Sequence, residues 1–267
     1  MSFATRALYV RALEDIRAGL RNVHLWPMLA WLEIKHRYRR SLLGPLWLTL
    51  STAVFIGGMG SLYGMLFGQS RAPYIHYLAV GVVVWIYIAG LINDGCQTFI
   101  AAEGLIKQTK LPLTVYALRV VWRNFLIFAH NFIIIVVVSA YFMPEWDWGL
   151  LTSAAGIVLI ALNGLALSLS LGLTSARFRD IPQIVASIVQ LLFFITPIFW
   201  RPAMLTAHPW IADWNPIFHF VELVRAPILG GPIPVDSWLI ALTLTVLTWV
   251  IAFGLFARFR ARIAYWA

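Results

Sequence analysis

The densest group of cationic side chains in this sequence lies in the stretch HRYRRSLLGPLW, at residues 36–47. Arg37, Arg39 and Arg40 are close together there, and the run that follows, from Leu46 to Gly68, has no charged residue. A guanidinium group pairs with phosphate oxygens through its planar fork and stays charged, and basic residues beside an apolar segment are attracted to anionic lipid headgroups. We expect these arginines to anchor the chain at a membrane surface, the alternative being a plain solvated charge run.

Motifs of covalent and nucleotide chemistry do not occur in the chain. No Gly-Lys dipeptide is present, which excludes a phosphate-binding P-loop, and neither HExxH nor G-x-S-x-G occurs. His219 and Glu222 form a lone H-x-x-E pair, which without further ligands is far more often structural than metal-binding. We therefore expect no catalytic residue, no metal and no cofactor in this chain, and any energy source must be another chain.

The composition is that of an integral membrane protein. Of the 267 residues 61% are hydrophobic and only 12% are charged, whereas a soluble domain keeps about a quarter of its residues charged. The formal net charge of +9 is compatible with nucleic-acid binding, so the positions of the basic residues must decide between that partner and a membrane. The single cysteine, Cys96, excludes an internal disulfide.

Six stretches lack Asp, Glu, Lys and Arg for about the 20 residues that a membrane helix needs. They are 46–68, 72–93, 124–144, 148–176, 181–200 and 237–257. We predict an all-α membrane protein with six transmembrane helices. Its three parts are a cytoplasmic amphipathic interface region at 1–43, a transmembrane domain at 44–257 and a cytoplasmic tail at 258–267.

The basic residues give the orientation. All Lys and Arg except Arg71, Arg201 and Arg225 fall at the N-terminus, around 101–123, at 174–182 or after 257, which alternates with every predicted span. This asymmetry predicts that both termini are cytoplasmic. Because the basic residues track one leaflet, membrane lipid is the expected partner and nucleic acid is excluded.

Small and polar residues inside the predicted spans can each have more than one role. Gly60, Gly64 and Gly68 recur at every fourth position, as do Gly164, Ser168 and Gly172, which favours a subunit or gating contact, or else ordinary intrachain packing. The polar residues are Asn93, Asp94, Asn124, His130, Asn131 and Asn163. Only two of these are ionisable, so we expect helix-to-helix hydrogen bonds in preference to a proton relay.

The stretch 197–234 holds seven of the 13 prolines and is too apolar for an external tail. We expect short re-entrant helices there on the external side, one of them beginning at Pro216. Glu222 and Arg225 are three positions apart on that helix and can form an ion pair.

Six motifs, in the same order, resemble one family. They are LEIKHRYRRSLLGPLW, IKQTKLPL, ARFRDIPQIV, ITPIFW, NPIFHFVELVR and the terminal YW. Over nearly the whole length, the sequence resembles the membrane subunit of type 2 ABC transporters that export polysaccharides or polyol phosphates, and in particular the O-antigen export permeases. The pattern of the capsule exporters around the first span is absent.

The resemblance implies an assembly and a set of site residues. It implies a homodimer with a central channel in the inner membrane, two separate ATPase subunits that bind ATP and Mg, and an undecaprenyl-pyrophosphate-linked glycan as cargo. Glu103, Lys107 and Lys110 are expected to contact the ATPase, and Arg37, Arg39 and Arg40 to lie at the substrate entrance. Expected channel-lining residues are Tyr63, Phe67, Phe193, Phe199 and Trp200, and the expected periplasmic gate residues are Asn215, Glu222 and Arg225.

Two other functions stay open at this point. An exporter of teichoic acid, capsule or another lipid or drug cargo belongs to the same superfamily. A polytopic enzyme that modifies glycans or lipids would need clustered acidic or His residues at one membrane face, whereas the external carboxylates here are dispersed over two loops.

Overall fold

The computed structural model describes residues 3–39, 41, 43–44, 46–142, 148–204 and 207–266. Every regular element within those ranges is a helix, as predicted. The elements are α1 (Phe3–Arg21), α2 (Leu25–Arg37), α3 (Leu46–Leu66), α4 (Arg71–Cys96), α5 (Glu103–Gln108), α6 (Leu113–Phe142), α7 (Gly149–Arg177), α8 (Ile181–Ile195), η1 (Pro202–Met204), α9 (Trp210–Asp213), α10 (Pro216–Ile228), α11 (Val235–Phe259), η2 (Arg260–Arg262) and α12 (Ile263–Trp266).

Five helices in the described part of the chain are long and apolar enough to cross a membrane. They lie at Leu46–Leu66, Pro73–Cys96, Leu113–Tyr141, Gly149–Arg177 and Val235–Trp266. The apolar helix α8 has only 15 residues, which at about 1.5 Å per residue reach roughly 22 Å, less than the hydrocarbon thickness of about 30 Å. The sixth span therefore stays a prediction, because residues 196–200 of the predicted range are not helical.

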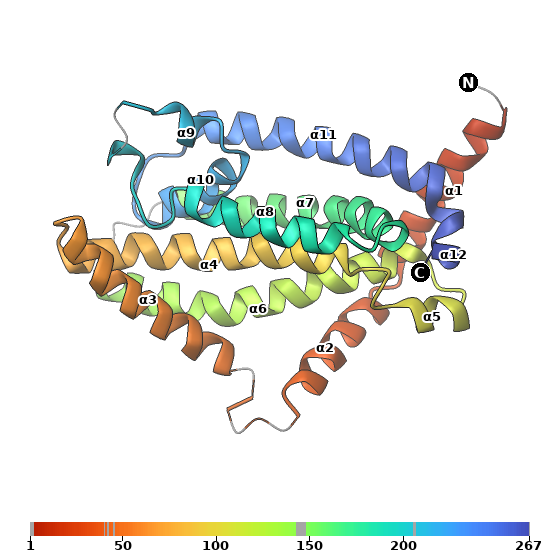
Figure 1. Ribbon diagram of the computed structural model, residues 1–267, viewed down its shortest axis with the longest axis horizontal. Helices are drawn as coiled ribbons and strands as arrows, with labels where there is room; N and C mark the ends of the chain where they lie inside the picture. The colour runs from red at the N-terminus through yellow and green to blue at the C-terminus, as the bar shows by residue number, and fades with distance from the viewer. Residues whose placement is uncertain are drawn as a thin grey trace.

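The long helices form a bundle with two distinct ends. Helices α4, α6, α7, α8 and α11 run along the long axis of the molecule, whereas α2 and α3 diverge from it (Figure 1). Helices α9 and α10 lie at one end of the bundle, and α1, α5 and α12 lie at the other (Figure 1). We call these the α10 end and the α5 end. The first and last described residues, Phe3 and Trp266, belong to α1 and α12 and so lie at the α5 end.

Helix α4 is the central element, and small residues let α7 approach it closely. A Cβ atom added to Gly164 would lie 2.7 Å from the Leu91 side chain, and one added to Gly172 would lie 3.1 Å from the Gly95 carbonyl oxygen. In α3, a Cβ atom on Gly60 would lie 2.7 Å from the Ile75 side chain. The small residues at fourfold spacing in α3 and α7 therefore pack within the chain at these positions.

Polar residues inside the bundle join neighbouring helices, as predicted. The amide of Asn124 in α6 donates to the carboxylate of Asp94 in α4 at 2.8 Å. The amide of Asn163 in α7 donates to the Thr245 hydroxyl in α11 at 2.7 Å. His130 instead bonds within its own helix, to the carbonyl of Leu126.

The N-terminal helices pack on the bundle through small and polar residues. In α1 the buried positions are Ala12, Asp15 and Gly19, whereas the apolar side chains of Leu13 and Leu20 are exposed. In α2, Ala30 and Ile34 are buried and Trp31 is exposed. Each helix therefore faces the bundle on one side and keeps an apolar side free, which is the arrangement of an interfacial helix.

Candidate functional site

The chain leaves helical geometry after α8, and three carbonyl groups of this segment are bonded by side chains from α4 and α10. We call residues 196–200 the α8 break. The hydroxyl of Tyr77 lies 3.1 Å from the carbonyl oxygens of both Pro197 and Trp200 and shares its one proton between them, and the hydroxyl of Tyr74 donates to the carbonyl of Phe199 at 2.5 Å. An unbonded carbonyl in hydrocarbon costs several kcal/mol, so these bonds make the break compatible with membrane depth.

Arg225 of α10 is the most enclosed charged side chain among the described residues, with none of its surface exposed. Its guanidinium donates to Pro197 O at 2.6 Å, pairs with the Glu222 carboxylate and lies 4.2 Å from the centre of the Tyr77 ring. The predicted ion pair between Glu222 and Arg225 is thus present. It is part of a larger contact that connects α10, α4 and the α8 break.

Asn215, the third predicted gate residue, fixes the start of α10. Its side-chain oxygen accepts hydrogen bonds from the backbone N–H groups of Ile217 and Phe218, as an N-cap residue does. Its amide group donates to the Thr196 hydroxyl at 2.9 Å. The start of α10 is therefore attached to the first residue of the α8 break. The depth of α9 and α10 in a membrane stays a prediction.

Four of the five predicted channel residues lie in one group of rings. The centroid of Tyr63 is 5.6 Å from that of Phe67 and 5.4 Å from that of Phe199, and Phe193 is 4.8 Å from Phe199. Trp85 of α4, which the sequence did not single out, lies 5.4 Å from Phe193. We call Tyr63, Phe67, Trp85, Phe193 and Phe199 the aromatic cluster.

The fifth predicted channel residue, Trp200, is placed differently. Its indole N–H donates to the carbonyl of Phe194 at 3.2 Å, which bonds the end of the α8 break to the last turn of α8. Whether any of these side chains lines a channel stays a prediction.

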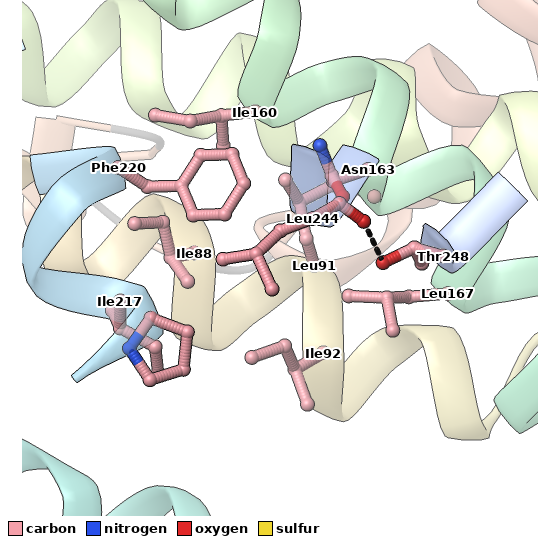
Figure 2. A pocket seen from close by; sticks show the side chains of 12 residues that line it. Ile88, Leu91, Ile92, Ile160, Asn163, Leu167, Ile217, Phe220, Leu244 and Thr248 are labelled. Carbon is pink, nitrogen blue, oxygen red and sulfur yellow. Dashed lines mark hydrogen bonds between the residues drawn. The ribbon is translucent and has the colours of Figure 1, made fainter. Parts of the chain in front are cut away.

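A cavity of about 230 Å³ lies between α4, α7, α10 and α11. In Figure 2 the ring of Phe220 lies beside Ile160 and Ile88. The two polar side chains in its wall already have partners, because the Thr248 hydroxyl donates to Leu244 O and the Asn163 amide donates to Leu159 O and Thr245. The cavity therefore offers little to a polar ligand.

A network of four charged side chains lies nearer the α5 end, and the sequence did not reveal it. Glu33 of α2 pairs with Arg119 at 2.8 Å and with Arg123 at 2.6 Å, both in α6. Arg123 also pairs with Asp94 of α4 at 2.7 Å. Helix α6 begins at Leu113, before the predicted span that starts at residue 124. It can contain the buried Arg119 and the partly buried Arg123 because acidic partners neutralise both.

Helix α5 carries two of the predicted ATPase-contact residues on its surface. Glu103 and Lys107 form an i,i+4 ion pair at 2.6 Å, with about half of each side chain exposed. The hydrogen bond and positive charge of Lys107 lower the pKa of the Glu103 carboxyl from its usual value. Lys110 follows α5 and is exposed. All three side chains are thus available to a partner.

The predicted entrance arginines lie at and after the end of α2. Arg37 is the last residue of α2, and both it and Arg39 are exposed. Arg40 lies outside the described residues.

The H-x-x-E pair has a structural role. His219 bonds through one ring nitrogen to the Ser237 hydroxyl at 3.0 Å and through the other to Asp213 O at 2.8 Å. Glu222 is paired with Arg225. Among the described residues, His, Cys, Asp and Glu form no group of three or more that could hold a metal ion.

Comparisons with known proteins identify the family of this chain. The family described as ABC-2 type transporter matches residues 24–229. An O-antigen export system permease protein RfbA of Klebsiella pneumoniae is 24% identical over 237 residues, which cover 87% of this chain and 90% of that protein. A protein of the same name from Myxococcus xanthus is 26% identical over 191 residues, or 67% of this chain and 73% of its own length. Since the family match covers most of the chain and includes both the α8 break and α5, this multi-pass membrane protein belongs to the ABC-2 type transporter family.

Proposed function

We propose that this chain is the permease subunit of an ABC transporter that exports a lipid-linked polysaccharide of the O-antigen type across the inner membrane. The observation that carries the proposal is the similarity, along nearly the whole chain, to proteins named as O-antigen export permeases. These relatives do not favour a teichoic acid, capsule, lipid or drug cargo, nor a membrane enzyme.

The part of the aromatic cluster that is not buried, namely Tyr63, Phe67 and Phe193, supports a carbohydrate cargo, whereas Trp85 and Phe199 are buried within the chain. The C–H faces of sugar rings stack on the electron-rich faces of aromatic rings, and an uncharged wall does not hold a moving polymer in one place. Tyr63 comes from α3, Phe67 directly follows that helix, and Phe193 comes from α8. We infer that α3 and α8 line the translocation path, with Phe199 and Trp200 at its outer end and α10 as the gate.

The exposed sides of α3 and α8 support a homodimer. Met65 of α3 is 70% exposed and Leu191 of α8 is 60% exposed. Both helices are apolar, and α3 is the least buried of the five candidate spans. A second copy of the chain facing these helices would enclose the path between the two protomers.

The family implies an ABC ATPase as partner, because the permease itself is a transport subunit. In our proposal ATP and Mg bind to that partner, and the contact is made by α5 through Glu103, Lys107 and Lys110. The α5 end is then cytoplasmic, together with both termini, and the entrance arginines 37, 39 and 40 lie at the same leaflet.

The experiment that tests the function is reconstitution with the ATPase. In a cell whose own O-antigen exporter has been deleted, this chain together with its ATPase should restore glycan at the surface. The purified chain alone should hydrolyse no ATP above background, and the pair should hydrolyse it. If surface glycan stays absent when both proteins are present in the membrane, the proposed polysaccharide cargo is wrong. If the chain alone hydrolyses ATP, the assignment of hydrolysis to a separate ATPase subunit is wrong.

Arginine chemistry at the entrance gives a separate prediction. If Arg39 binds the pyrophosphate of a lipid-linked glycan, Arg39→Lys should reduce export several-fold, because lysine keeps the charge but loses the planar fork. The amount of chain in the membrane and its assembly with the ATPase should not change. Normal export by this variant would leave Arg39 with an anchoring role only. The rate of surface glycan appearance measures the difference.

A further inference from the structure

A groove of about 360 Å³ lies at the α5 end between α1, the segment that follows α5 and the C-terminal helices. Residues from three distant parts of the sequence line it, among them Leu8, Arg11, Lys110, Arg260, Ala261 and Ala264. Ile106 of α5 also belongs to its wall, so the groove adjoins the helix that we propose as the ATPase contact. We call it the terminal groove.

A buried carboxylate fixes the walls of the terminal groove. Asp15 of α1 accepts hydrogen bonds from the backbone N–H groups of Leu113 and Thr114 at 3.2 and 3.0 Å and from the Thr114 hydroxyl at 2.8 Å. It also pairs with Arg260 at 3.0 Å. A second N–H group of Arg260 donates to the carbonyl of Arg11. The Asp15 side chain thus joins α1, the start of α6 and the C-terminal region. These bonds hold the walls of the groove in fixed positions relative to one another.

The charge in the terminal groove is positive. Arg11, Lys110 and Arg260 line it, and no Asp or Glu does. Arg11 and Lys110 are exposed, whereas Arg260 is held by Asp15. Leu8, Ala261 and Ala264 add apolar surface between the cations. An occupant that complements this surface presents a carboxylate beside a small apolar side chain.

We propose that the terminal groove is a second docking surface for the ATPase subunit, and that it receives an acidic residue of that subunit flanked by apolar side chains. The inference rests on the proposed function, since it takes the α5 end to face the ATPase. Its support is the positive charge of the groove and its continuity with α5 through Ile106 and Lys110. Docking there makes the N- and C-terminal helices part of the contact with the ATPase.

Binding measurements with four variants test the proposal. The chain is placed in nanodiscs of neutral phosphatidylcholine, and the dissociation constant of its ATPase is measured. Arg11→Glu reverses an exposed charge of the groove, and Ala264→Trp fills the groove from an exposed position. Arg17→Glu is the matched control, because it makes the same reversal on an exposed residue of α1 that does not line the groove. Lys107→Glu probes α5.

We expect Arg11→Glu and Ala264→Trp each to raise the dissociation constant about tenfold, with Arg17→Glu unchanged and Lys107→Glu also weakened. Ala264→Trp keeps the test valid if the charge reversal disturbs folding. If both groove variants bind like Arg17→Glu while Lys107→Glu weakens binding, the groove proposal is wrong and the proposed function stands. A wild-type chain that binds no ABC ATPase contradicts the proposed function itself.

A repeat in nanodiscs with phosphatidylglycerol separates a lipid occupant from a protein occupant. If the groove variants bind the ATPase normally in phosphatidylcholine and weakly only when the anionic lipid is present, the groove serves an anionic lipid. That result would also overturn the proposal.

Discussion

Replacing Arg225 by methionine should lower the free energy of unfolding by about 3–5 kcal/mol, the usual cost of removing one partner from a buried ion pair. The Glu222 carboxylate would lose its partner, and the carbonyl of Pro197 would keep only its bond from Tyr77. Thermal unfolding of the detergent-solubilised protein measures the loss. Because the α8 break carries Phe199 of the aromatic cluster, export should fall as well.

Two further variants show whether the ion pair causes the effect. Arg201→Met removes a cation that also faces the Tyr77 ring, at 5.2 Å, but that is partly exposed, so it should cost no more than about 1 kcal/mol. The double variant Arg225→Met, Glu222→Gln should be more stable than Arg225→Met, because no unpaired charge remains. Equal losses for Arg225→Met and Arg201→Met would show that the buried pair contributes nothing beyond its contact with the ring.

Replacing Glu33 by leucine should destabilise the α5 end and release α2. Arg119 would lose its ion pair, and Arg123 would keep only that with Asp94, so we expect a loss of about 3 kcal/mol or more. Since Glu33 is the only residue of α2 in this network, α2 should become more accessible. A cysteine at the buried position Ala30 should react with a membrane-impermeant maleimide faster in this variant than in the parent.

The control for Glu33 is Glu14→Gln, which removes an exposed carboxylate from the neighbouring helix α1. Its unfolding temperature and the reactivity of the cysteine at position 30 should match those of the parent. If Glu33→Leu behaves in the same way as Glu14→Gln, the docking of α2 depends on its apolar contacts, such as Trp26 with Trp122, and not on the charges.

Most of the fold could be predicted from local patterns, because a membrane helix is recognised by the length and apolar content of one continuous stretch of sequence. The rule failed where charge is neutralised by distant residues. Arg119 and Arg123 ended the predicted third span, yet both lie inside α6 because Glu33, about 90 positions away in the sequence, pairs with them. A charge-free run therefore gives a minimum length for a helix, and its true end depends on tertiary partners that spacing does not reveal.

In the candidate site, too, features that depend on neighbouring residues could be predicted, and features that depend on distant residues could not. Both the pair of Glu222 and Arg225 and the cap at Asn215 depend on residues that are close in the sequence. The three-residue spacing of Glu222 and Arg225 sufficed to predict their ion pair. The bonds of Tyr74 and Tyr77 to the α8 break join residues about 120 positions apart, and nothing in a lone tyrosine marks it as a partner of a carbonyl. Asp15 is a further example, since an acidic residue on an amphipathic helix is ordinarily read as solvent-facing.

The contact between Asp15 and Arg260 can form only late in the synthesis of the chain. The two residues are 245 positions apart, so at about 5–20 residues per second the ribosome makes the arginine roughly 10–50 s after the aspartate. Once residues 113 and 114 have been made, α1 has its bonds to the start of α6 available but still lacks Arg260. The terminal groove is completed only when the last helices have been made, so a nascent or truncated chain does not yet present that surface to a partner.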